Sequence, residues 1–91
     1  MRISPNFILR EVAGEFIVIP VGEAARNLSG LIALNGSGKF LFDLLKSERT
    51  EKELVSSMLE TYDVDEKTAA ADVSAFLDML REQRMLIESN M

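Results

Sequence analysis

The apolar residues of this chain change their spacing at one place, between Leu34 and Phe40. Before it, short uninterrupted apolar runs predict strands; after it, apolar residues recur every three or four positions, as on one face of a helix. All five glycines and both prolines lie at or before Gly38. The remainder therefore fits helices joined by polar turns, and the whole pattern predicts an α+β fold.

Three strands are expected in the first part of the chain, at residues 7–10, 16–19 and 31–34. Ala13 and Gly14 fit a tight turn between the first two, and residues 22–29 form a looser connection. Short connections favour antiparallel pairing in chain order, which gives a three-stranded meander. Strands 7–10 and 31–34 are then its two edges.

These two edges carry different side chains. Pro5, Arg10 and Glu11 are residues that blunt edge-to-edge association, and they flank or belong to the first strand. The strand at 31–34 has neither charge nor proline. An apolar edge of this kind is covered by another part of the same chain or receives a separate peptide as an added strand, and this pattern leaves both possibilities open.

Three helices are expected after the strands. The first spans about 36–46, the second begins at the capping box of Thr50 and Glu53, and the third begins at the N-cap Asp65 and extends to about 84. The short apolar tail at 85–87 fits a strand or an extended arm. The last two helices and their turn at 62–65 resemble a helix-turn-helix pair, so the arrangement is winged helix-turn-helix-like.

Length and composition favour one domain spanning residues 1–91 without catalytic chemistry. The chain has no cysteine and no histidine, which removes disulfides, thiolate chemistry and the commonest general base and metal ligand. The run 36–39 superficially resembles a phosphate loop, but Ala33 and Phe40 occupy positions where that motif requires glycine and serine or threonine. We therefore expect no catalytic residue, no cofactor and no metal.

The net charge of −5 argues against nucleic acid as a partner. Residues 1–34 balance at three basic and three acidic side chains, whereas residues 35–91 carry seven basic and twelve acidic ones. A net-negative third helix does not suit a groove lined with phosphates. No apolar run approaches the length of a membrane span and no signal peptide is apparent, so we expect a cytoplasmic protein that binds no membrane.

Several short motifs, taken in order, resemble the PqqD family, which is named for a small protein of pyrroloquinoline quinone (PQQ) biosynthesis. That family belongs to the RiPP recognition elements, the peptide-binding modules of ribosomal peptide natural-product pathways. The resemblance covers residues 6–86. It rests on residues 18–22, Gly30-Leu31-Ile32-Ala33-Leu34-Asn35, Gly38-x-Phe40-Leu41-Phe42, Tyr62-Asp63-Val64, Ala71-Asp72-Val73 and Phe76-Leu77.

The resemblance implies a three-stranded sheet packed on three helices that binds the leader of a precursor peptide. Members present the leader to a modifying enzyme, often of the radical S-adenosylmethionine type. The leader adds to the third strand beside the third helix, which points to Leu31, Ile32, Ala33 and Leu34 for main-chain pairing and to Val73, Phe76, Leu77 and Leu80 on the helix. Strand residues alternate between faces, so only Leu31 with Ala33, or Ile32 with Leu34, can face the groove.

The leading hypothesis is therefore a non-catalytic peptide-binding adaptor in PQQ or other RiPP biosynthesis. Its partners would be a precursor leader peptide and a radical S-adenosylmethionine or other maturation enzyme. One alternative is a winged-helix DNA-binding regulator, which the acidic third helix disfavours. The other is a structural dimerisation module, a homodimer in which the open strand pairs with a second copy.

Overall fold

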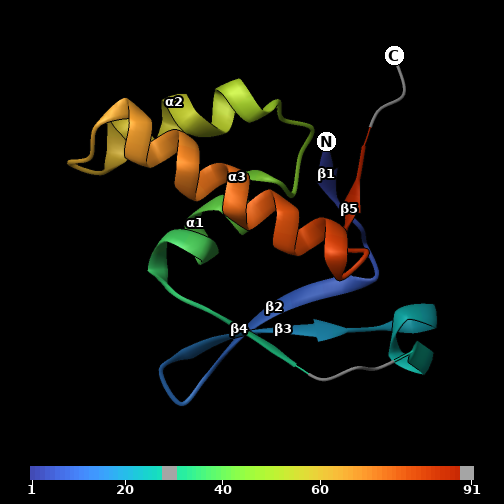
Figure 1. Ribbon diagram of the computed structural model, residues 1–91. Coiled ribbons are helices and arrows are strands. Elements are labelled where there is room, and N and C mark those ends of the chain that lie inside the picture. The colour runs from blue at the N-terminus through green and yellow to red at the C-terminus, as the bar shows by residue number, and fades with distance from the viewer. Residues whose placement is uncertain (28–30, 89–91) are drawn as a thin grey trace.

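The sheet and the helices form two layers in the computed structural model, which describes residues 1–27 and 31–88. All three α-helices lie on the same side of the larger sheet (Figure 1). The predicted α+β order of three antiparallel strands followed by three helices is confirmed. In chain order the elements are β1 (Arg2–Ile3), β2 (Phe7–Val12), β3 (Glu15–Pro20), the 3-10 helix η1 (Gly22–Asn27), β4 (Ile32–Leu34), α1 (Gly36–Leu44), α2 (Glu51–Thr61), α3 (Glu66–Glu82) and β5 (Leu86–Ile87).

The larger sheet has the strand order β2-β3-β4, so β2 and β4 are its edges, as the meander predicts. β2 and β3 pair without interruption from Phe7 opposite Pro20 to Val12 opposite Glu15. The turn between them holds Ala13 at φ 53° and the next residue, Gly14, at φ 82°. Two positive φ angles in a two-residue hairpin are typical of a type I′ turn, whose twist matches that of the strands.

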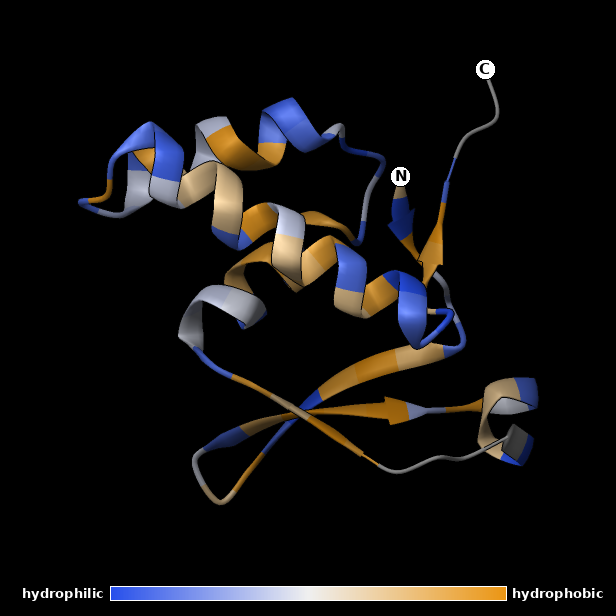
Figure 2. Cartoon of the chain, viewed as in Figure 1, coloured by the Kyte–Doolittle hydropathy of each residue, from blue (hydrophilic) through white to orange (hydrophobic). Residues whose placement is uncertain are grey.

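The core lies between the helices and the sheet. Most strand residues are apolar, while each helix alternates apolar and polar positions (Figure 2). This difference follows from position, because a surface helix buries one stripe of its circumference. The buried apolar side chains are Ile3, Val18, Leu41, Phe42, Leu45, Leu54, Met58, Ala69, Val73, Leu77, Leu80 and Met85.

The helix N-termini were the most accurately predicted local features. Asn35, Thr50 and Asp65 are the N-caps, and Thr50 and Glu53 form the complete capping box, with bonds of 2.8 and 3.1 Å. The Asp65 carboxylate accepts a hydrogen bond from a backbone N–H of the first turn, which lowers its pKa. These caps depend on local side-chain chemistry and so are visible in the sequence.

Element ends differ from prediction in several places. α1 ends at Leu44 and α3 at Glu82, two residues earlier than expected in both cases. β4 begins at Ile32, so Leu31 is not part of the strand. The connection at 22–29 contains the 3-10 helix Gly22–Asn27, which was not predicted, and its last two residues lie outside the described ranges.

A second, two-stranded sheet joins the two ends of the chain. β1, which the sequence did not predict, pairs with β5, which the tail at 85–87 left open as strand or arm. Ile3 donates a backbone hydrogen bond to Leu45 and Ser4 donates one to Met85, each of 2.8 Å. Ile3 and Met85 are also buried, so this small sheet closes one end of the core.

The end of α3 turns toward β5 through a Schellman motif. Met85 N–H bonds to the Leu80 carbonyl at 2.9 Å and Arg84 N–H to the Arg81 carbonyl at 3.1 Å. Arg84 adopts φ 57°, the left-handed position that glycine normally occupies in this motif. The turn places Met85 in the core at the cost of a strained arginine.

Replacing that arginine tests this strain. Arg84→Gly should exceed Arg84→Ala in free energy of unfolding by about 1 kcal/mol, because glycine adopts a positive φ without a Cβ clash. Both variants lose the guanidinium, so their difference isolates the backbone effect. Chemical denaturation measures both, and equal stabilities would show that the left-handed turn carries no strain.

Candidate functional site

The residue pairs at the start of β2 determine which pairs of the larger sheet are hydrogen-bonded. Val21 N–H donates to the Asn6 carbonyl at 2.7 Å. The next pair, Phe7 opposite Pro20, cannot exchange two bonds because proline has no N–H, and Phe7 N–H donates to Ser4 instead. In an antiparallel pair, bonded and non-bonded pairs alternate. The odd-numbered residues of β3 therefore bond to β2, and its even-numbered residues bond to β4.

This phase decides which backbone groups of β4 are available. Ile32 and Leu34 lie opposite Val18 and Phe16, the even-numbered residues of β3, so their N–H and C=O groups point into the sheet. Ala33, between them, directs its N–H and C=O to the open edge. Among the described residues, no backbone bond outside the sheet involves Ala33. The edge thus presents one donor and one acceptor from the same residue.

The structure shows which side chains of β4 face the helices, a choice that the sequence left open. Ile32 and Leu34 are half-buried and pack against the core, on the side of the helices. Ala33 is exposed on the other face, and Leu31, just before the strand, is 61% exposed. Of the two predicted pairs, Ile32 with Leu34 therefore lies on the side of α3.

The candidates on α3 divide into two sets. Val73, Leu77 and Leu80 are fully buried in the core, whereas Phe76 is half-buried at its margin. Met79 is also half-buried and lies three residues after Phe76, on the same helix stripe. The sequence reasoning did not single out Met79, although its spacing from Phe76 was a signal for it.

β4 and α3 meet over the first turn of α1. A Cβ added to Gly38 would lie 3.4 Å from Leu34 Cβ, 3.5 Å from Phe76 Cε1 and 3.2 Å from the Asn35 side-chain oxygen. The distance to the Asn35 oxygen is tight, whereas those to Leu34 and Phe76 are ordinary van der Waals contacts, so Leu34 and Phe76 both lie beside Gly38. We call the Ala33 backbone together with the side chains of Ile32, Leu34, Phe76 and Met79 the β4–α3 surface.

A charged side chain of α1 contacts the sheet beside β4. Lys39 Nζ lies 2.8 Å from the Asp43 carboxylate and 5.6 Å from the centre of the Phe16 ring. The hydrogen bond to Asp43 raises the pKa of Lys39. Lys39 thus links α1 to β3, and the ammonium adds a cation–π contact with the strand that pairs with β4.

The β4–α3 surface combines main-chain groups with apolar side chains. It offers backbone groups at a sheet edge and apolar side chains beside them, which is what an added strand requires. Within residues 1–27 and 31–88, no group of three or more acidic, histidine or cysteine side chains could hold a metal ion. In the same ranges, no helix is long and apolar enough to cross a membrane.

Comparison with known proteins identifies the family. The family model of coenzyme PQQ synthesis protein D (PqqD) matches residues 15–86. This match covers well over half of the chain, so the chain belongs to the PqqD family. No curated protein matches the chain by sequence.

Two solved structures share the fold. One is described as TbiB1 in complex with the TbiA(beta) leader peptide, with a TM-score of 0.78 and 21% identity over 100% of each chain. The other is lasso peptide synthetase B1 complexed with the leader peptide, with a TM-score of 0.75 and 16% identity over 96% of each chain. At these identities the similarity concerns the fold.

The two glycines of the first turn of α1 allow a test of the close approach. Gly36→Ala should raise the free energy of unfolding by about 0.5–1 kcal/mol, because a Cβ there meets nothing within 4 Å. Gly38→Ala should gain clearly less, since its Cβ would lie only 3.2 Å from the side-chain oxygen of the Asn35 cap. Equal gains in chemical denaturation would show that the Asn35 cap tolerates a Cβ at position 38.

Proposed function

We propose that this member of the PqqD family is a non-catalytic adaptor for ribosomally made peptides. It binds the leader of a precursor peptide by strand addition to β4 and presents it to a modifying enzyme, in PQQ or other RiPP biosynthesis. The observation that carries the proposal is the outward N–H and C=O of Ala33 beside the apolar margin of α3. Two structures of the same fold are described as leader-peptide complexes, which supports it.

In the proposed complex, backbone contacts and side-chain contacts have different roles. Ala33 exchanges two main-chain hydrogen bonds with the leader, which fixes the register of the added strand. Alternate leader side chains then pack toward Ile32, Leu34 and Phe76. The buried candidates on α3 act from the core by holding that helix in place: Val73, Leu77 and Leu80. Leu31 lies immediately before β4, where a longer leader would extend past the strand.

The modifying enzyme is a separate partner in this proposal. A peptide-binding domain without its own reacting groups requires another protein for the chemistry, and the family of radical S-adenosylmethionine enzymes is the expected class. The whole chain would act as one domain for the leader. Four acidic side chains have structural roles: Glu53 and Asp65 cap helices, and Asp43 and Asp78 form ion pairs.

The charges of α3 do not favour the DNA-binding alternative. The helix carries Glu66, Asp72, Asp78 and Glu82 against Lys67 and Arg81. The Arg81 guanidinium is moreover engaged, 3.1 Å from Asp78 and 2.9 Å from Glu88. A phosphate backbone would meet net repulsion from this helix. A homodimer through β4 would use the same Ala33 groups as the leader, so it would compete with leader binding.

The direction of the backbone groups predicts opposite effects for proline at neighbouring positions. Ala33→Pro removes the outward N–H and should weaken leader binding at least about fivefold while the fold persists, because proline is tolerated at an open edge. Ile32→Pro removes a donor to β3 and should lower the free energy of unfolding. Titration of labelled protein with leader peptides encoded beside its gene, followed by two-dimensional NMR, measures the first effect.

Ala33→Val is the matched control. It keeps the N–H and places a larger side chain on the face away from the helices, so leader affinity should remain within about twofold. Unchanged affinity in Ala33→Pro, with the fold intact, would contradict strand addition at β4. Shift changes with duplex DNA, or with protein concentration alone, would favour the regulator or the homodimer instead.

A further inference from the structure

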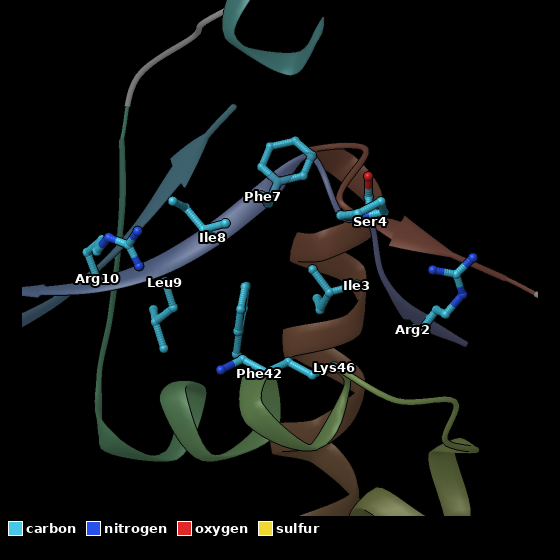
Figure 3. Close-up of a pocket in the computed structure, with 10 residues that line it drawn as sticks. Arg2, Ile3, Ser4, Phe7, Ile8, Leu9, Arg10, Phe42 and Lys46 are labelled. Carbon is cyan, nitrogen blue, oxygen red and sulfur yellow. The ribbon is translucent and has the colours of Figure 1, made fainter. Parts of the chain in front are cut away.

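The opposite edge of the sheet borders a cleft that lies outside the β4–α3 surface. This cleft has a volume of about 350 Å³ and lies between the start of the chain, β2 and the end of α1. Figure 3 shows Leu9, Phe42 and Ile3 in its middle, with Arg10 and Arg2 toward its two ends. Phe42 is 1% and Ile3 6% exposed, so the floor of the cleft is apolar and part of the core.

The phase of the sheet also leaves backbone groups free at this edge. Ile8 and Arg10 lie in the bonded pairs that follow from the Val21–Asn6 bond, so their N–H and C=O groups point to β3. Leu9, between them, directs both groups to the open side of β2, where the cleft lies. Pro5, expected to guard this edge, precedes the strand and removes no donor from it.

The cleft is lined by positive charge, although the chain as a whole is negative. Its lining includes Arg2, Arg10 and Lys46 and no carboxylate, although the net charge of the protein is −5. Lys46 lies 3.2 Å from Asp43. Within the described residues, neither Arg2 nor Arg10 forms an ion pair. Two unpaired guanidinium groups at the ends of an apolar cleft complement an acidic ligand.

We propose that β2 and this cleft bind an extended acidic segment of a partner protein. The segment adds as a strand to β2 through the N–H and C=O of Leu9. Its alternate apolar side chains enter the cleft above Phe42, and its carboxylates meet Arg10 and Arg2. Because β2 and β4 are opposite edges of one sheet, this segment and a leader can bind at the same time. That the partner is the modifying enzyme rests on the proposed function; the binding site itself does not.

A blocked hexapeptide of alternating aspartate and valine is a suitable probe. Titrated into the labelled full chain, it should shift and protect the amide of Leu9 and leave that of Ala33 unchanged. Binding should weaken as salt is raised. The double variant Arg2→Gln and Arg10→Gln should weaken it about three- to tenfold, the effect of losing two exposed ion pairs.

The double variant Arg26→Gln and Arg84→Gln removes the same charge from residues that do not line the cleft and should leave affinity unchanged. The asparagine–valine peptide should bind at least about threefold more weakly than the probe. The proposal is overturned by an absent response at Leu9, by equal losses in the two double variants, or by a response to protein concentration alone. Leader binding is read separately at Ala33, so failure at either edge is distinguishable from failure at the other.

Discussion

The position of Pro20 in the hairpin determines which backbone groups point outward at both edges of the sheet. Proline has no N–H, so its pair with Phe7 cannot be a bonded one, and the bonded pairs must fall on the alternate positions. The uninterrupted register carries this phase across β3 to β4. As a result, a residue in the middle of each edge strand, Leu9 in β2 and Ala33 in β4, presents both backbone groups outward. A bulge in β3 would shift this pattern by one residue, so that inward-pointing and outward-pointing residues of an edge strand would change places.

The placement of the helices keeps these edges open. All three pack on one side of the sheet, and the two-stranded sheet of β1 and β5 closes the end of the core without pairing to β2 (Figure 1). α3 approaches β4 through Phe76, which lies with Leu34 beside Gly38. The helices thus supply an apolar wall beside one edge, while the end of α1 supplies Phe42 beneath the other.

Local chemistry explains which features the sequence predicted. Residues a few positions apart determine the caps at Asn35, Thr50 and Asp65 and the type of each long element, so these features could be predicted from the sequence. β1 has two residues and acquires its structure from β5, at the other end of the chain, so no local period could reveal it. The α3 stripe showed which residues are apolar, but only packing separates the buried Val73, Leu77 and Leu80 from the marginal Phe76 and Met79.

In the proposed leader complex, the short β4 limits how much affinity the backbone can supply. Two main-chain hydrogen bonds at Ala33 contribute about 1–3 kcal/mol in net free energy, whereas a micromolar complex requires about 8 kcal/mol. Most of the remainder must come from apolar side chains buried against Ile32, Leu34, Phe76 and Met79, at about 25 cal/mol per Å². Under the proposed function, main-chain pairing then sets the register of the leader, and its apolar residues determine how tightly it binds. A leader that lacked apolar residues at alternate positions would therefore bind weakly even with its backbone correctly paired.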